Sequence, residues 1–501
     1  MNRPEAETLV DMLAKNAARQ PDKVALIYSD RHMTYRTLYR QCNALANFLC
    51  KTGVRPGENV GFILNKTPEL IISFLGVVSA GAVVFPVDIH QPTHQMQHLM
   101  DITCPRMMIV CEEYRHLLSP LSLPSDYLGT LMVGTPLCAE DYLWNDVIDN
   151  SDPNPPEVAV HLNDPAYLNL TSGTTGSPKC AVTTHANIFW NTIAAVETLG
   201  LTVDDVHLCL FAVFAHPHEL VARPLLLGGT FVLLDKIAPK TISRTIIEHG
   251  VTCMMAIASI YRMLVQLHEA APFELPSLKY PESGGMHTPV TLLKEFEARF
   301  HRRIIPVWGS TEASGIALAM APEMVYKPGS VGIPCSYYEA RIVDDDGTEV
   351  DAGQVGELLI RGAGVISHYL GNREETEKSI RDGWLHTGDM FHKDASGYFY
   401  FAGRRQGLLK VGGLKVYPTE IEEILQSHPD ILEAVVVKEL DSLHGEVPRA
   451  IVIPRNSAVL NKRDIRLYCE KRLPKYKVPK IIEFRQELPK TSGGKIRWKD
   501  L

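Results

Sequence analysis

The stretch TSGTTGSPKC (Thr171–Cys180) places several hydroxyl side chains, two glycines and a lysine next to one another. Such residues form poor core elements, since glycine is costly to order and Ser and Thr compete for backbone hydrogen bonds. The flanks are ordered, because AYLNL (Ala166–Leu170) is typical of a strand and HANIFWNTIAAVETLG (His185–Gly200) predicts a helix ending at Gly200. A glycine-rich turn between a strand and a helix suits phosphate oxygens, whereas a solvated surface loop is the plain alternative. The spacing is not that of a Walker loop.

The bulk composition limits the class of protein. A chain of 501 residues is too long to fold around a single hydrophobic core, so we expect two or more domains. The net charge of −8 argues against a nucleic-acid partner. Ten cysteines without C-x-x-C spacing, and an amino terminus without an apolar signal core, predict a cytoplasmic protein with reduced thiols.

One uncharged stretch, LIISFLGVVSAGAVVFPV (Leu70–Val87), reaches the length of a membrane span. Gly76, Ser79, Gly81 and Pro86 interrupt it. The pattern favours a helix followed by a buried strand of a parallel sheet, and no membrane span.

Helical and strand patterns alternate for about four fifths of the chain, which is typical of an α/β fold. From about residue 330 short strands with turn residues follow, including a D-D-G turn that predicts a hairpin. A smaller α+β unit begins after the basic, glycine-flanked AGRRQG (402–407). We therefore predict an N-terminal domain, 1–402, of layered α/β subdomains plus a β-rich subdomain, and a C-terminal domain, 403–501.

Five motifs occur in the order and rough spacing of one known family. They are TSGTTGSPK (Thr171–Lys179), WGSTE (Trp308–Glu312), GWLHTGD (Gly383–Asp389), GRRQGLLKVGGLKVYPTEIE (Gly403–Glu422) and LPKTSGGKI (Leu488–Ile496). Over nearly its whole length the chain resembles the acyl-adenylate-forming, AMP-dependent synthetases and ligases, of the acyl-/aryl-CoA synthetase type. The resemblance implies that a carboxylate attacks the α-phosphorus of ATP, and that a thiol then displaces AMP from the acyl-adenylate.

This chemistry brings two anions together, so cations and hydrogen-bond donors are needed. The resemblance implies that the glycine-rich loop holds the β- and γ-phosphates, and that Thr311 contacts phosphate. Glu312 would hold Mg²⁺, although an acid at the start of a helix explains it equally well. The implied phosphate ligands are Thr171, Ser172, Gly173, Thr174, Thr175, Gly176 and Lys179. Cys180 stands where the family usually has glycine.

The resemblance also assigns the nucleoside. Asp389 matches the acid that accepts hydrogen bonds from both ribose hydroxyls, although an ordinary turn aspartate would fit the same place. Arg404 matches the arginine that reaches the ribose, and Gly284 and Gly285 lie in the segment expected beside the adenine.

Lys495, six residues from the end of the printed sequence, matches the catalytic lysine that bridges the carboxylate and the α-phosphate. A frayed tail is the alternative for so glycine-rich a segment. The resemblance implies a mobile C-terminal domain that delivers Lys495 and then rotates about Gln406, where relatives usually have Asp or Lys. Gly412, Gly413 and Leu414 would then line the path of coenzyme A.

The acyl pocket is expected at Phe214, His216, Trp308 and Gly309. Phe211–Leu220 contains no Asp that would bind an α-amino group, so an α-amino acid is disfavoured. His216 and His218 either bind a polar substituent or a second carboxylate, or pack as ordinary histidines.

The sequence therefore predicts an AMP-forming carboxylate–CoA ligase that uses ATP, Mg²⁺ and coenzyme A. A separate acyl carrier protein is the alternative acceptor, because no carrier domain follows Lys495 in this sequence. A nucleotide-binding regulator with the same fold is a further alternative, disfavoured by the presence of Lys495, Glu312 and Asp389.

Overall fold

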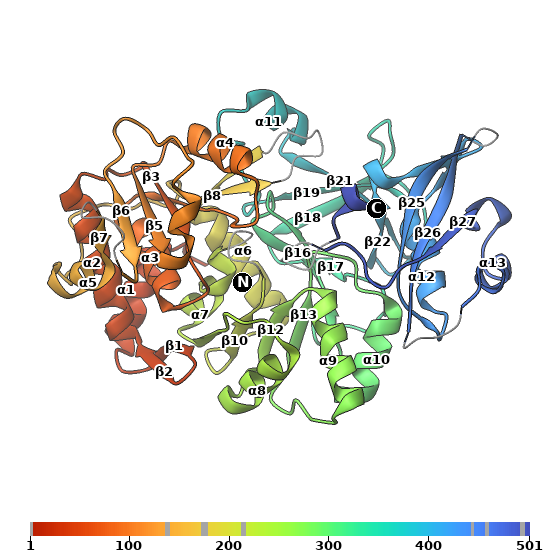
Figure 1. The fold of residues 1–501 in the computed structure, drawn as a ribbon, viewed down its shortest axis with the longest axis horizontal. Coiled ribbons are helices and arrows are strands. Elements are labelled where there is room, and N and C mark those ends of the chain that lie inside the picture. Colours follow the sequence, from red (N-terminus) through yellow and green to blue (C-terminus); the bar gives the residue numbers. More distant parts are fainter. Residues whose placement is uncertain are drawn as a thin grey trace.

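A computed structural model describes residues 4–135, 141–171, 179–211, 217–441, 445–455, 460–490 and 496–501. The elements form two seven-stranded sheets, a β-rich region and a smaller C-terminal unit, which is drawn in blue in Figure 1. The helices are α1 (Leu9–Arg19), α2 (Tyr35–Thr52), α3 (Pro68–Ser79), α4 (Thr93–Thr103), α5 (Trp144–Asn150), α6 (His185–Leu199), α7 (Ala222–Leu227), α8 (Pro239–His249), α9 (Ala258–Ala270), α10 (Val290–Phe300), α11 (Arg373–Ser379), α12 (Pro418–Gln426) and α13 (Lys462–Glu470).

The first sheet carries the strands on either side of the glycine-rich loop. Its order is β7 (Tyr142–Leu143), β6 (Thr130–Val133), β5 (Met107–Cys111), β3 (Asn59–Ile63), β4 (Val83–Pro86), β8 (Pro165–Thr171) and β9 (Lys179–Thr184). All neighbours are parallel except β8 and β9. The loop therefore joins two antiparallel strands, and the expectation that it leads directly into a helix was wrong. KCAVTT (Lys179–Thr184) forms a buried strand first, and its side chains, including Cys180, are covered by the apolar cluster around them.

Helix α6 begins at His185 and ends at Gly200 as predicted. Thr184 caps it by accepting from the amide of Asn187, and Gly200 takes the left-handed conformation with φ 67°. The uncharged stretch Leu70–Val87 likewise forms most of helix α3 followed by strand β4, as expected. No described helix has both the length and the apolarity to cross a bilayer.

The second sheet has the order β14 (Ile305–Pro306), β13 (Tyr280–Ser283), β12 (Cys253–Ala256), β10 (Val206–Cys209), β11 (Thr230–Leu233), β1 (Val24–Tyr28) and β2 (Arg31–Thr34). It is parallel apart from the β1–β2 hairpin. One buried apolar cluster joins the two sheets, since it contains Phe62 of β3 and Phe231 of β11. Ligands of parallel sheets bind beyond the carboxyl ends of the strands, and Gly284 directly follows β13.

The β-rich region follows, as the short strand patterns with turn residues from about residue 330 predicted. It consists of β15 (Trp308–Ser310), β16 (Gly315–Ala319) and β17 (Ile333–Pro334), then β18 (Tyr338–Val343), β19 (Gly356–Gly362), β20 (Ile380–Arg381), β21 (Trp384–Lys393) and β22 (Phe399–Arg404). The D-D-G turn closes on an isolated antiparallel bridge between Val343 and Glu349, so its second arm is shorter than a strand.

The C-terminal unit has its own apolar cluster, which includes Ile421, Val436 and Ile465. Helices α12 and α13 lie with β23 (Leu409–Val411), β24 (Leu414–Val416), β25 (Ile431–Asp441), β26 (Gly445–Pro454) and β27 (Ile481–Phe484). The proposed boundary between 402 and 403 falls just before the end of β22, which pairs with β21 up to Arg404.

Candidate active site

Asp389 lies near the middle of β21, and its carboxylate is buried (6% exposed). The indole Nε1 of Trp308 donates to Oδ2 at 2.8 Å, and Arg404 Nε lies 3.1 Å from Oδ1. Within the described residues Oδ1 accepts no hydrogen bond. A buried acceptor that has an ion-pair partner but accepts no hydrogen bond fits a ligand hydroxyl, which is the role the resemblance predicts for this acid.

Opposing effects act on the pKa of Asp389. Burial raises the pKa of this carboxyl, while the charge of Arg404 and the hydrogen bond from Trp308 lower it. Arg404 is largely exposed, so its charge is well solvated. The strand register sets Arg404 directly opposite Asp389, because β21 and β22 pair at these residues.

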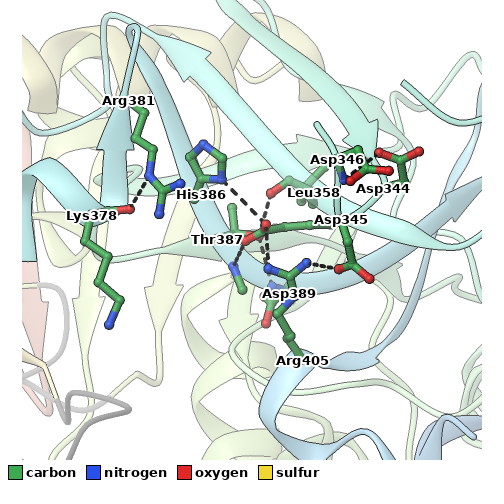
Figure 2. Close-up of polar contacts among 12 residues, drawn as sticks. Asp344, Asp345, Asp346, Leu358, Lys378, Arg381, His386, Thr387, Asp389 and Arg405 are labelled. Carbon is green, nitrogen blue, oxygen red and sulfur yellow. Dashed lines mark hydrogen bonds and ion pairs between the residues drawn. The ribbon is translucent and has the colours of Figure 1, made fainter. Parts of the chain in front are cut away.

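The backbone around Asp389 is held by hydrogen bonds within β21 and to the neighbouring strand β19 (Figure 2). The Thr387 hydroxyl donates to the carbonyl of Leu358 at 2.7 Å and accepts from the Asp389 amide at 3.1 Å. The amide of Gly388 donates to the Glu357 carboxylate at 3.0 Å. These bonds fix the turn that aims the Asp389 side chain.

Glu312 lies in the turn between β15 and β16. The hydroxyl of Tyr369 donates to its Oε1 at 2.8 Å, and the amide of Ile366 donates to its carbonyl at 2.8 Å. Burial, and then the charge of Glu312, raise the pKa of Tyr369 well above its usual value, so the phenol stays a donor. Glu312 therefore has a fixed carboxylate, the kind of ligand that Mg²⁺ takes once or twice beside phosphate oxygens and water. Among the described residues no three His, Cys, Asp or Glu side chains gather as a metal site.

Lys179 opens β9 and is 9% exposed. Its ammonium pairs with the carboxylate of Glu375 on α11 and lies 5.3 Å from the centroid of the Tyr369 ring. The pairing with Lys179 lowers the pKa of Glu375 against the opposing effect of burial. The structure thus brings two predicted residues, Lys179 and Glu312, to one tyrosine.

The expected adenine segment has little room for side chains. A Cβ on Gly284 would lie 2.8 Å from Val307 Cγ2, and Gly285 has φ +77°. A side chain on Gly284 would therefore require Val307 to move, and the left-handed backbone of Gly285 favours glycine.

Trp308 and Gly309, expected in the acyl pocket, lie on β15. Trp308 also contacts Asp389, so it stands beside the predicted ribose acid. A Cβ on Gly309 would lie 2.3 Å from the carbonyl oxygen of Gly315, which explains the glycine by packing.

His218 is buried, and its Nε2 lies 2.9 Å from the carbonyl oxygen of Ser314. Its ring stacks on Tyr167 at 5.2 Å, and burial lowers its pKa to about 4. It is therefore neutral at physiological pH, which disfavours an ion pair with a second carboxylate. Nearby, Nη1 of the buried Arg223 donates to both carboxylate oxygens of the buried Glu282, at 2.7 and 2.9 Å.

The remaining predicted positions lie in the C-terminal part of the chain. Gln406 lies in the single 3₁₀ turn Arg405–Gly407. Gly412 and Gly413, at the tip of the β23–β24 hairpin, have φ +55° and +85°, and a Cβ on either meets nothing within 4 Å. Leu414 is 51% exposed, so this hairpin tip is open to solvent.

Several predicted residues lie outside the described part of the chain. They are Ser172, Gly173, Thr174, Thr175, Gly176, Phe214, His216 and Lys495. Thr171 is the last residue of β8, and Thr311 precedes Glu312 in the β15–β16 turn.

Sequence reasoning missed Tyr369, Glu375, Arg223 and Glu282. Tyr369 and Glu375 are near each other in sequence, but their partners Glu312 and Lys179 are 57 and 196 residues away. The remaining pair, Arg223 and Glu282, is likewise joined only by the fold.

Comparison with known proteins gives the family. Residues 13–370 match the model of the AMP-binding enzymes, and residues 420–495 match that of the AMP-binding enzyme C-terminal domain. The chain is 30% identical to a long-chain-fatty-acid–CoA ligase of Bacillus subtilis (strain 168), over 98% of this chain and 93% of the relative. It is 29% identical to a feruloyl-CoA synthase of an Amycolatopsis species, over 96% of each chain.

A solved structure agrees with these matches. The crystal structure of an anthranilate CoA ligase in complex with anthranoyl-AMP has a TM-score of 0.91 and 29% identity, covering 99% of this chain and 97% of that one. The chain belongs to the AMP-binding enzyme family, as an AMP-forming acid–thiol ligase of the acyl-/aryl-CoA synthetase type.

Proposed function

We propose that this ligase joins an aromatic or other acyl monocarboxylate to coenzyme A through an acyl-adenylate. The observation that carries the assignment of the nucleotide site is the buried Asp389, held by Trp308 and Arg404 with one oxygen free of hydrogen bonds from the described residues. The relatives named above act on long-chain fatty acids, on ferulate and on anthranilate, which sets the range of acids to be tested. Neutral, stacked His218 adds no charge for a second carboxylate.

The residues divide the first step among them. Lys179, Thr311 and the loop Thr171–Gly176 would bind the phosphates, while Gly284, Gly285, Asp389 and Arg404 would bind the nucleoside. Glu312 would hold a Mg²⁺ ion, which supplies positive charge to the phosphate oxygens. Lys495 would contact the carboxylate and the α-phosphate as negative charge develops between them.

We further propose that the chain divides at 402/403 and that the C-terminal unit moves about Gln406. The hairpin with Gly412, Gly413 and Leu414 would then face the thiol. Leu414 is exposed and a Cβ on either glycine would meet nothing within 4 Å in the described part of the chain, which suits a surface that meets a ligand only after a rotation. Coenzyme A is the acceptor, and a carrier protein is not required.

Carboxylate-dependent exchange of pyrophosphate into ATP tests the first step. A panel of aryl, arylalkyl, short-chain and long-chain acids should contain at least one that supports exchange with Mg²⁺ and not with EDTA. The same acid with coenzyme A alone should release AMP at catalytic rates. If the acyl-adenylate persisted until a purified carrier protein was added, the proposed acceptor would be wrong.

A further inference from the structure

The segment between β19 and β20 is fixed to the strand and the turn that carry Lys179 and Glu312. The Ile366 amide donates to the Glu312 carbonyl at 2.8 Å, and the Leu370 amide donates to the Cys180 carbonyl at 2.7 Å. Ala181 and Tyr369 form an isolated antiparallel bridge. Tyr369 is therefore held by its backbone and is 3% exposed.

The side chain of Tyr369 contacts both predicted groups at once. Its hydroxyl donates to Glu312 Oε1 at 2.8 Å, and its ring faces the Lys179 ammonium at 5.3 Å. A carboxylate has two oxygens, so a donor on Oε1 fixes its plane and leaves Oε2 for another ligand. The ring face attracts the cation without neutralising its charge.

The same segment supplies the counter-ion of Lys179. Glu375 pairs with that ammonium, and its own amide donates to the Asn372 side chain at 3.0 Å as part of the cap of α11. One stretch of chain, 369–375, therefore supplies the side chains that contact both the Lys179 ammonium and the Glu312 carboxylate. No such role follows from either motif alone.

We propose that Tyr369 is a positioning residue, which orients Glu312 toward Mg²⁺ and holds Lys179 beside it for the phosphates of ATP. The inference rests on the proposed roles of Glu312 and Lys179. A group that orients a metal-binding carboxylate affects the affinity for the metal complex and leaves distant contacts unchanged. Tyr369 should therefore matter for Mg²⁺·ATP and not for AMP.

Isothermal titration calorimetry without any carboxylic acid tests this, because no turnover then occurs. Tyr369→Phe keeps the ring and removes the hydroxyl. We expect it to weaken Mg²⁺·ATP binding about tenfold, with AMP binding unchanged. Tyr35→Phe is the matched control, since its buried hydroxyl donates to the carbonyls of Pro224 and Gly229, outside the site.

A double-mutant cycle with Glu312→Gln gives the decisive readout. If Tyr369 acts through Glu312, then Tyr369→Phe adds little to the loss that Glu312→Gln already causes. Losses that multiply, or a Tyr369→Phe affinity equal to that of the unmodified protein, would overturn the inference while leaving the ligase function intact. If Glu312→Gln itself did not change Mg²⁺·ATP binding, the proposed metal role of Glu312 would fail, and the inference with it.

A second variant keeps the test valid if Tyr369→Phe does not fold, as loss of AMP binding would reveal. Glu312→Asp retains the charge, but the shorter side chain moves the carboxylate out of reach of the Tyr369 hydroxyl. We expect it to weaken Mg²⁺·ATP binding with AMP binding unchanged. Affinity equal to that of the unmodified protein would contradict the inference.

Discussion

Asp389→Asn should weaken nucleotide binding and stabilise the free protein at the same time. The substitution keeps the size of the side chain and an oxygen that can accept from Trp308 Nε1. It removes a charge whose burial raises the pKa of Asp389, and the partner Arg404 is exposed enough to be solvated alone. Burying this charge destabilises the free protein, while the same charge binds the nucleotide. Its removal should therefore lower the affinity for the nucleotide and raise the stability of the free protein.

The loss of binding follows from the hydrogen bonds. A hydrogen bond to a charged acceptor contributes about 1.5–3 kcal/mol. With one ribose bond lost, AMP affinity should fall by about 10- to 150-fold. Calorimetry with AMP measures this change.

The change in stability depends on pH. The folded pKa of Asp389 is raised above its unfolded value, so its stabilising contribution is present below the unfolded pKa and is lost as pH rises through the folded pKa. Asp389→Asn should therefore raise the midpoint of thermal unfolding at neutral pH, and the gain should shrink in acid. A lower midpoint at neutral pH would show that Asp389 is structural, and unchanged AMP affinity would show that it does not contact the ribose.

Three further predictions follow from the structure and the motifs. Lys495→Ala should slow acyl-adenylate formation by about 10²–10³ and spare thioester formation from synthetic acyl-AMP, and equal damage to both half-reactions would refute domain alternation. Gly309→Ala should lower the free energy of unfolding by about 1–3 kcal/mol, because its Cβ would lie 2.3 Å from a backbone oxygen of β16. Gly407→Ala, where a Cβ meets nothing within 4 Å, is the control in the same denaturant titration. Asp345 pairs with Arg405 and Lys415, on either side of the proposed hinge at Gln406, so Asp345→Asn should speed tryptic cleavage at these basic residues. Asp346→Asn, in the same turn, should not.

The sequence was most informative where local pattern and chemistry agree. The glycines and Pro86 of the uncharged stretch were enough to predict α3 and β4, and Gly200 marked the end of α6. The prediction that the glycine-rich loop leads directly into a helix failed, because strand β9 lies between them. The segment KCAVTT is too short for its periodicity to distinguish a buried strand from a loop. A strand of this kind is stabilised by its partner β8, which local sequence does not reveal.

The site was predictable as a set of motifs and not as a set of contacts. Asp389, Glu312 and Lys179 could be named because each lies in a motif of the family. The sequence could not show that Trp308 donates to Asp389 or that Tyr369 joins Glu312 to Lys179, since these pairs form only when distant strands meet. Tyr369 in SHYLGN resembles any buried aromatic before a turn.

Among the described residues, polar side chains form contacts between the two parts of the chain, which bears on how the C-terminal unit could move. His287 Nε2 lies 2.5 Å from Glu423 Oε1, and Arg455 pairs with Glu295 at 2.9 Å. Each of these side chains is partly exposed. Pairs of this kind contribute little net stability, because water replaces the lost partner when they separate. These two contacts can therefore separate at low cost.

The contacts around the proposed hinge at Gln406 are asymmetric. Arg405, just before Gln406, reaches back to Asp345 at 2.5 Å and to Glu357 at 3.3 Å (Figure 2), so the chain up to this point stays with the β-rich region. Lys415, beyond the hinge, shares Asp345 at 2.9 Å. A rotation that begins after Arg405 would break the Lys415 pair and keep both Arg405 pairs. Asp345 would then retain a cation in either orientation, so the rotation would leave this carboxylate paired.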